Sequence, residues 1–297
     1  MNACFRQVFV SCMMNEMTAK DADGKTIRIG CQSWGYDDWV TPAGSEYIFY
    51  PPGTKKSEML AFYSKIFDTV EVDATLYGVP AVSTFRKWHD EAPENFLFSL
   101  KFPREITHDR RLSPATIPIM EEFVERARLL KEKLGILLIQ LPASFEASKE
   151  NGQNLRELLS HLPGDIKFAV EFRDSNWLID WAFEELERNG VTLSLVEGPW
   201  IARERMFEAV DRIKTEFVYV RLMGKRDLQK FDRICRPRDN ALKEWARMTP
   251  HFSAKDLYIY VSNTFEGFAP ESAAKLKRLL DIPVLSAADA QEQRSLF

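Results

Sequence analysis

Metal-binding and disulfide motifs are missing from this 297-residue sequence. Its four cysteines form no CxxC pair, and their spacing matches no zinc module. No HExxH motif occurs, and the four histidines are too scattered for a dense zinc cluster. We therefore expect reduced thiols in a cytoplasmic protein, and we assign no metal ligands. The residues concerned are Cys4, Cys12, Cys31, Cys235, His89, His108, His161 and His251.

Long apolar runs and a strong charge bias are also missing. No run reaches the ~18 apolar residues of a membrane-spanning helix, so we expect no membrane partner. The formal net charge of −4 does not favour a chain that coats nucleic acid as a whole. The apolar stretch Val8–Met14 is too short for a secretion signal. We expect residues 1–26 to be a short disordered extension, residues 27–285 one domain, and residues 286–297 a tail.

Within residues 27–285, short β-branched or aromatic runs alternate with helical stretches, eight of each. The expected strands are Ile27–Cys31, Thr69–Asp73, Leu97–Lys101, Ile136–Leu141, Phe168–Phe172, Thr192–Val196, Phe217–Leu222 and Leu257–Val261. The expected helices are Glu58–Phe67, Val82–Glu91, Ile117–Leu134, Asn154–Leu162, Trp177–Asn189, Glu204–Ile213, Ala241–Thr249 and Pro270–Leu280. We expect Ser57 and Asn176 to cap two of these helices, and Gly135 to end the longest.

Strict alternation of strand and helix predicts an α/β fold with a parallel sheet. Eight units fit a single (β/α)8 TIM-type barrel, and an open doubly wound sheet is the alternative. The first strand is followed by Gly30-Cys31-Gln32-Ser33-Trp34-Gly35, not by a GxGxxG turn. The dinucleotide-binding form of the open sheet is therefore disfavoured.

Polar side chains recur at the ends of the expected strands. Because side chains alternate along a strand, those that do not share the parity of the apolar helix-facing residues point into the barrel. Those on the inward parity are Glu71, Asp73, Ser99, Lys101, Gln140, Ala169, Glu171, Arg173, Tyr219, Arg221 and Met223. In barrels, polar residues at the C-terminal ends of strands usually belong to the functional site.

Burying charged groups is costly unless they pair or bind a ligand. We expect Glu71, Glu171 and Lys101 to be catalytic, with the two carboxylates as acid/base groups. A purely structural ion-pair network is the alternative, and a glycosidase-like carboxylate pair, a Schiff base on Lys101 or a divalent cation on Glu71, Asp73 and Glu171 are others. The expected substrate-binding residues are Trp34, Asp73, Tyr77, His108, Gln140, Arg173, Arg221 and Asn263.

The loop after the seventh strand, residues 224–239, carries a net charge of +3 from six basic and three acidic residues. Barrel enzymes often bind phosphate near the loops after strands seven and eight. We therefore expect Lys225, Arg226 and Arg233 to bind an anion, with a solvated surface loop as the alternative. Aromatic residues Trp39 and Trp177 also follow strands, and packing within their loops is at least as good an explanation as ligand stacking.

Several short motifs, taken together and in order, resemble the YecE-like family, a group of domains of unknown function. The matching segments are Ile29-Gly30 through Trp34, Val70–Tyr77 with Pro80, Lys101 with Pro103, Ile106–His108, Gln140–Pro142, Glu171–Arg173 with Ser175 and Trp177, Tyr219–Arg221 with Gly224, and Asn263 with Gly267, Ala269 and Pro270. The resemblance implies a TIM barrel and no specific reaction. A relation of such proteins to endonuclease IV-like barrels keeps nuclease chemistry as an alternative.

The sequence departs from this family pattern at three places. Asp174 and Met223 stand where a histidine is common, and Ser262-Asn263-Thr264 replaces a more polar triplet. These changes remove candidate metal ligands.

Three functions remain open after the sequence is read. The first is an enzyme (a hydrolase, lyase or isomerase) that acts by acid/base catalysis on a small anionic, phosphorylated or sugar-like substrate. The second is a metal-assisted phosphodiesterase or nuclease, which would require a divalent metal and nucleic acid as partner. The third is a barrel that binds a ligand without turnover.

Overall fold

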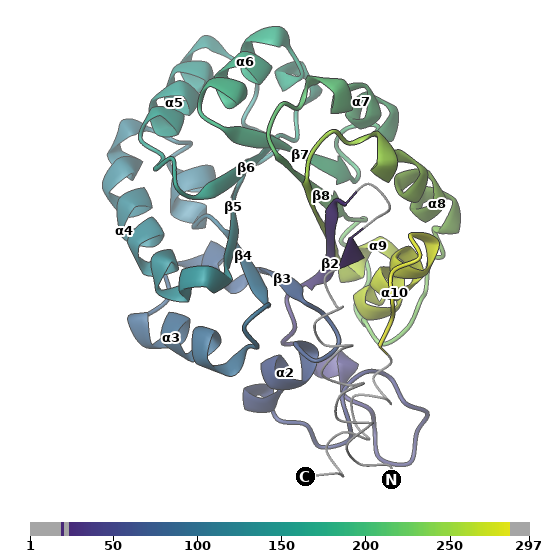
Figure 1. The fold of residues 1–297 in the computed structure, drawn as a ribbon. Coiled ribbons are helices and arrows are strands. Elements are labelled where there is room, and N and C mark those ends of the chain that lie inside the picture. The colour runs from purple at the N-terminus through teal and green to yellow at the C-terminus, as the bar shows by residue number, and fades with distance from the viewer. Residues whose placement is uncertain (1–18, 21–23, 286–297) are drawn as a thin grey trace.

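The computed structural model describes residues 19–20 and 24–285, and it has a closed barrel of eight parallel strands (Figure 1). Each strand pairs with the next, and β2 pairs with β9 from Thr26↔Asp256 to Cys31↔Val261, which closes the ring. The strands are β2 Thr26–Gln32, β3 Thr69–Val72, β4 Leu97–Lys101, β5 Leu134–Gln140, β6 Lys167–Glu171, β7 Val191–Glu197, β8 Phe217–Leu222 and β9 Asp256–Val261. The predicted TIM-type barrel is confirmed.

A short strand precedes the barrel. β1, Ala19–Lys20, pairs antiparallel with β2 through Ala19↔Ile27 and Lys20↔Thr26. It falls within the segment that we expected to be a disordered extension. The rest of that segment up to residue 23, and the expected tail at residues 286–297, lie outside the described residues.

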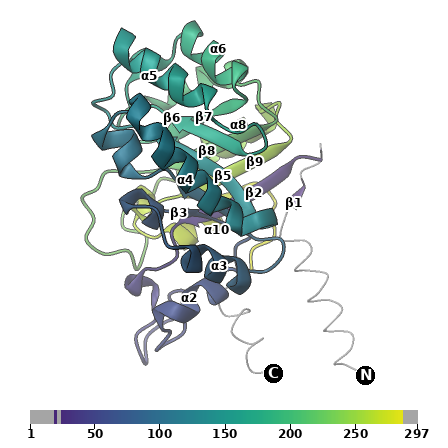
Figure 2. The same cartoon turned by 90° about the vertical axis from the view of Figure 1, so that its left-hand side faces the viewer.

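Helices surround the barrel, as two perpendicular views show (Figures 1 and 2). They are α2 Lys56–Tyr63, α3 Val82–Glu91, α4 Ile117–Ala127, α5 Lys149–Ser160, α6 Asp180–Arg188, α7 Arg203–Glu208, α8 Asp239–Met248, α9 Asn263–Glu266 and α10 Ala269–Leu279. The short helix α9 was not expected. In the described part of the chain, no helix is long and apolar enough to cross a membrane.

Three expected helix boundaries are wrong, each for a local reason. Ser57 lies inside α2, which begins one residue earlier, and the Glu58 carboxylate accepts a hydrogen bond from the Lys55 N–H at 3.0 Å. Gly135 lies in β5, because the chain passes from α4 through a 3₁₀ turn, Arg128–Lys133, directly into the strand. Asn176 caps no helix, since it lies in a 3₁₀ turn that precedes α6.

The barrel separates two apolar layers, as strand parity predicts. Val70, Val72 and Phe98 belong to the large cluster between strands and helices. A second cluster fills the barrel interior with Ile136, Leu138, Ala169, Phe217, Tyr219, Tyr258 and Tyr260. Packed apolar and tyrosine side chains therefore occupy the lower barrel interior, and the charged side chains lie above them, at the C-terminal ends of the strands.

One glycine allows the strands to meet. A Cβ atom on Gly30 of β2 would lie 2.1 Å from the Thr69 carbonyl oxygen, closer than any real contact. The site therefore requires a residue without a side chain, because β2 and β3 approach closely there.

Candidate functional site

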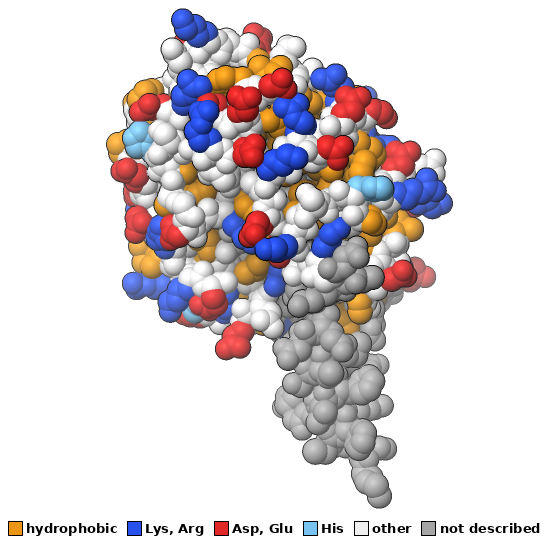
Figure 3. Space-filling model, turned by 45° about the horizontal axis from the view of Figure 1, so that its top comes forward, with side chains coloured by type: hydrophobic (Ala, Val, Ile, Leu, Met, Phe, Trp, Pro, Cys, Tyr) orange, Lys and Arg blue, Asp and Glu red, His pale blue; other side chains and the backbone are white. Residues whose placement is uncertain are grey.

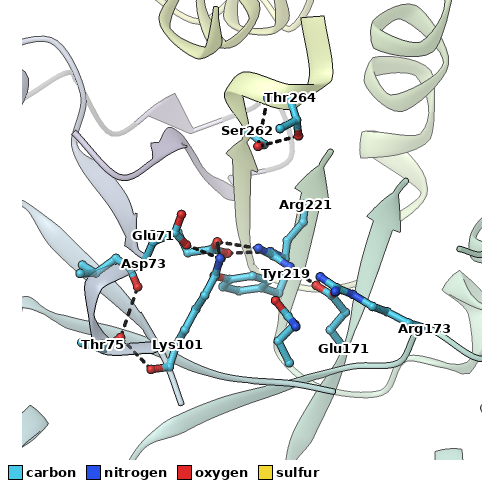
Figure 4. Close-up of polar contacts among 12 residues, drawn as sticks. Glu71, Asp73, Thr75, Lys101, Glu171, Arg173, Tyr219, Arg221, Ser262 and Thr264 are labelled. Atoms are coloured by element: carbon cyan, nitrogen blue, oxygen red, sulfur yellow. Dashed lines mark hydrogen bonds and ion pairs between the residues drawn. The ribbon is translucent and has the colours of Figure 1, made fainter. Parts of the chain in front are cut away.

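Six charged side chains meet at the C-terminal mouth of the barrel, which is the end where the carboxyl ends of the strands converge (Figure 4). We call them the central cluster: Glu71, Asp73, Lys101, Glu171, Arg173 and Arg221. They come from the ends of β3, β4, β6 and β8 or the residues that follow. All six were expected on the inward parity, and the structure brings them together.

Arg221 lies at the centre of the cluster and is completely buried. Its Nε and Nη2 atoms donate to the two carboxylate oxygens of Glu71 at 2.8 and 2.9 Å, and its Nη1 donates to Glu171. One guanidinium thus ties β3 to β6 across the barrel. Such a fully hydrogen-bonded arrangement is the form in which buried charges are tolerated.

Glu71 is surrounded by donors. Besides Arg221, it accepts a hydrogen bond from the Tyr219 hydroxyl at 2.6 Å and lies 3.1 Å from the Lys101 ammonium. Burial would raise the pKa of this carboxyl, but Arg221 and Lys101 outweigh burial and lower the pKa to about 2. Glu71 is therefore ionised throughout the neutral pH range.

Glu171 has a similar environment. Its carboxylate accepts from Arg221 and, at 2.8 Å, from Arg173 Nε. Burial opposes ionisation, yet the neighbouring Arg221 and Arg173 lower the pKa of Glu171 below its ordinary value. Neither Glu71 nor Glu171 carries a proton that it can donate near neutral pH.

Lys101 and Asp73 form the part of the cluster nearest to solvent. The Lys101 ammonium contacts both Glu71 and Asp73. The Asp73 side chain is 32% exposed, whereas the Glu71 side chain is 0% exposed. A ligand that enters the mouth can therefore meet the Lys101–Asp73 pair before it meets Glu71.

Arg173 presents a free donor. Its guanidinium stacks on the Trp200 ring, with the Cζ atom 3.6 Å from the ring centroid. Its Nε bonds Glu171, but its buried Nη2 has no hydrogen-bond partner among the described residues. A buried guanidinium nitrogen without an acceptor indicates that a water molecule or a ligand completes it.

His108 and Gln140 lie beside this donor. The imidazole Nδ1 of His108 is 2.8 Å from the Thr107 hydroxyl, and its Nε2 is 3.4 Å from the Gln140 amide nitrogen. Burial, followed by the positive charge of Arg173, lowers the pKa of His108 below its ordinary value. His108 is therefore neutral at pH 7, as a general base must be.

Two amide groups at other strand ends repeat the pattern seen at Arg173. The side-chain nitrogens of Gln32 and Asn263 are buried and unpaired within the described part of the chain. Gln32 ends β2 in register with Glu71, and Asn263 uses its Oδ1 to accept from the Ala269 N–H at 2.9 Å. All three unpaired groups are donors, so the mouth offers hydrogen bonds to an oxygen-rich ligand.

Two expected rim residues lie elsewhere. Trp34 packs edge-on against Trp88 and Phe98, on the helix side of the barrel wall. Tyr77 is 85% exposed and makes no ring contact with the described residues. Neither is part of the central cluster, because the turns after β2 and β3 direct them away from it.

Trp39 and Trp177 serve loop packing. Trp39 is buried among Tyr36, Phe49 and Phe268, and Trp177 stacks between Phe145 and Phe172.

The basic loop after β8 is partly neutralised by its own ion pairs. Arg236 bonds Asp227 at 2.8 Å, and Arg238 bonds Glu197 at 2.6 Å. Lys225, Arg226 and Arg233 are exposed, and Arg233 lies 3.9 Å from Asp232. Lys225 lines a hollow between this loop and Gly198-Pro199 after β7.

Charges elsewhere on the surface are mixed. In Figure 3, acidic and basic side chains are interspersed over the face that is drawn. This face gives no extended basic surface of the kind that binds nucleic acid.

The carboxylates expected as an alternative cation site are already occupied. Arg221, Lys101 and Arg173 surround the oxygens of Glu71, Asp73 and Glu171. The Asp174 carboxylate accepts from the Ala147 and Asn176 N–H groups, both at 3.0 Å. Among the residues that the structure describes, no three His, Cys, Asp or Glu side chains are grouped to hold a metal ion.

The sequence reading missed two residues of the mouth. Gln32 lies on the inward parity of β2, so the rule that found Glu71 also identifies it. Trp200 lies three residues beyond the end of β7, after Gly198-Pro199. An aromatic residue in a strand-end loop is a signal, but the sequence does not reveal that Arg173 is its partner.

Comparison with known proteins gives relatives of the same kind. The chain is 27% identical over 290 residues to the protein named UPF0759 protein YunF of Bacillus subtilis (strain 168), covering 89% of this chain and 98% of the relative. It is 27% identical over 165 residues to UPF0759 protein YecE of Escherichia coli (strain K12), covering 56% and 55%.

A solved structure supports the fold. The crystal structure of a DUF72 family protein from Thermotoga maritima MSB8 superposes with a TM-score of 0.69 at 24% identity, covering 86% of this chain and 99% of that chain. The model of the family described as "Protein of unknown function DUF72" matches residues 28–295. The YecE-like resemblance is confirmed, and this chain belongs to the DUF72 family.

Proposed function

We propose that this protein is an enzyme that binds a small anionic or sugar-like substrate at the barrel mouth and acts on it by acid/base catalysis. The unpaired, buried Arg173 Nη2 is the observation that carries the proposal. A ligand oxygen that accepts from this nitrogen removes the cost of an unsatisfied buried donor. Gln32, Gln140 and Asn263 offer further amide groups to the same ligand.

The proton-transfer role falls on three groups that the ligand can reach. Glu71 and Glu171 hold Arg221 in place, and their low pKa values suit a rigid ionic frame better than acid catalysis. His108, neutral at pH 7, takes a proton from the substrate. The Lys101 ammonium, oriented by Asp73, balances the negative charge that develops on the substrate.

The exposed basic residues of the loop after β8 support an anionic substrate. Arg226 is close enough to Arg173 to disfavour its charge, so the loop adds positive potential to the same mouth. The hollow beside Lys225 lies near the ends of the seventh and eighth barrel strands, a common phosphate-binding position in this fold. Together these features favour a phosphorylated or carboxylated ligand in a cytoplasmic setting.

Calorimetric titration tests the proposal. The panel contains a neutral sugar, the same sugar as its phosphate, and the corresponding sugar acid. We expect at least one anionic member to bind the wild-type chain, and Arg173→Met to weaken this binding about tenfold or more, since 1.4 kcal/mol corresponds to tenfold.

The matched control is Arg212→Met. Arg212 also stacks on an aromatic ring, Phe183, but its partner is Asp180 on the surface. This variant loses the same charge and should bind as the wild type does. Equal weakening by both variants, or no binding by any panel member, would contradict the proposal. Binding without any turnover of the bound compound would leave a ligand-binding barrel instead of an enzyme.

A further inference from the structure

A second cleft lies on the outside of the barrel, away from the mouth. It is bounded by the loop before α2, the connection from α2 to β3, and helix α10, and its volume is about 240 Å³. Most of its lining is apolar. The principal apolar residues are Ile48, Phe49, Ile66, Phe67, Phe268 and Ala274.

Lys277 of α10 also lines this cleft and is nearly completely buried, with 3% of its surface exposed. Its Nζ atom lies 5.1 Å from the centroid of the Phe67 ring. It forms no side-chain hydrogen bond or ion pair with any residue that the structure describes. Burial lowers the pKa of this amine, which is the physical sign of an ammonium without a counter-ion.

The other charges around the cleft already have partners. Glu271 and Arg278, which also line it, pair with each other at 3.2 Å. Asp68, on the inner side, pairs with Arg28 at 2.9 Å. Lys277 is therefore a buried cation whose charge a ligand can complement, placed against an apolar surface.

We propose that this cleft binds a small amphipathic carboxylate, whose aliphatic tail lies among the apolar residues and whose carboxylate accepts hydrogen bonds from Lys277. The apolar lining provides the hydrophobic contribution to binding, and the ion pair removes the cost of the uncompensated ammonium. At ~30 Å³ for each water-sized group, the volume holds about eight such groups. A medium-length chain such as octanoate fits this size.

The test is calorimetric titration of the full chain with octanoate and with 1-octanol, which has the same tail without the charge. We expect octanoate to bind the wild-type protein at least tenfold more tightly than octanol. We expect Lys277→Met to reduce octanoate affinity about tenfold or more and to leave octanol affinity unchanged. Methionine retains most of the side-chain volume, so packing against Phe67 is preserved.

The control variant is Lys255→Met, which removes an exposed lysine that pairs with Glu216 and lies outside the cleft. It should bind octanoate as the wild type does. Failure of octanoate to bind the wild-type chain, or equal affinity for octanoate and octanol, would overturn the proposal even if Lys277→Met did not fold. Octanoate affinity unchanged in a folded Lys277→Met variant would also overturn it.

Discussion

Arg221 is the side chain on which the charged interior depends. It is fully buried and satisfies two buried carboxylates at once. Removal of one partner from a buried ion pair is more costly than removal of the whole group, because the remaining charge stays uncompensated. The barrel should therefore tolerate loss of Arg221 much less well than loss of a surface arginine.

We predict that Arg221→Met lowers the free energy of unfolding by about 3–5 kcal/mol, measured by urea denaturation. Arg205→Met, which removes an exposed arginine 3.6 Å from Glu208, should change stability by no more than ~0.5 kcal/mol. Because the loss comes from the stranded carboxylates, adding Glu71→Gln and Glu171→Gln to Arg221→Met should restore part of it. Equal effects of the two single variants would contradict the role of Arg221.

Glu71 links the same cluster to pH. Its pKa is about 2 in the folded chain against an ordinary value of 4.5, so the folded state holds its proton more weakly than the unfolded state. Its contribution to stability is complete above about pH 4.5 and is lost as the pH falls towards 2. A shift of this size corresponds to about 3 kcal/mol.

We predict that the wild-type protein loses about 2 kcal/mol more unfolding free energy between pH 5 and pH 3 than Glu71→Gln does. Urea denaturation at the two pH values measures this difference. Glu121→Gln, which removes an exposed carboxylate from α4, should lose as much as the wild type. Parallel losses in the wild type and Glu71→Gln would show that the Glu71 pKa is not depressed.

Strands and their parity could be predicted from the sequence, whereas turns could not. Phe217–Leu222 and Val82–Glu91 were predicted with the observed bounds, because each has a clear periodicity of apolar residues and breaks at its ends. Gly135 was misread as a helix stop because a 3₁₀ turn already ends the helix upstream. The four-residue helix α9 has too few residues for a period to be recognised.

Loop geometry also explains which site residues could be predicted. Glu71, Lys101, Glu171 and Arg221 were found because a period of two fixes their direction. The direction of Trp34 was not predictable, since it follows Ser33, whose φ of 62° is in the left-handed region. The pairing of Arg173 with Trp200 joins two loops from different units, and no local pattern encodes it.

The loop after β8 gives a further prediction. Charge reversal at Lys225, Arg226 and Arg233, each to Glu, should weaken binding of a phosphorylated ligand at least tenfold and steepen its dependence on salt. Fluorescence titration with the ligand identified for the mouth measures the change. The same reversal at three exposed basic residues remote from the mouth, Lys25, Lys214 and Lys255, is the control, and comparable weakening in both variants would mean that only net charge matters.

Across the whole barrel, one end is built for closure and the other for chemistry. At the N-terminal ends of the strands, Lys167 pairs with Asp256 at 2.6 Å and lies over the Phe217 and Tyr258 rings. Above that floor lie the tyrosine layer and then the central cluster, whose three acidic and three basic groups balance in charge. The fold was predictable because strand–helix alternation repeats eight times, but the reaction was not, because one fold serves many reactions.

The most direct test of the account is a crystal structure of the chain soaked in inorganic phosphate. The account predicts a phosphate oxygen within hydrogen-bonding distance of Arg173 Nη2, with a Gln140 or Asn263 amide nearby. A structure in which Arg173 Nη2 donates to an acceptor of the chain itself, with no phosphate at the mouth, would contradict the claim that these donors await an oxygen-rich ligand.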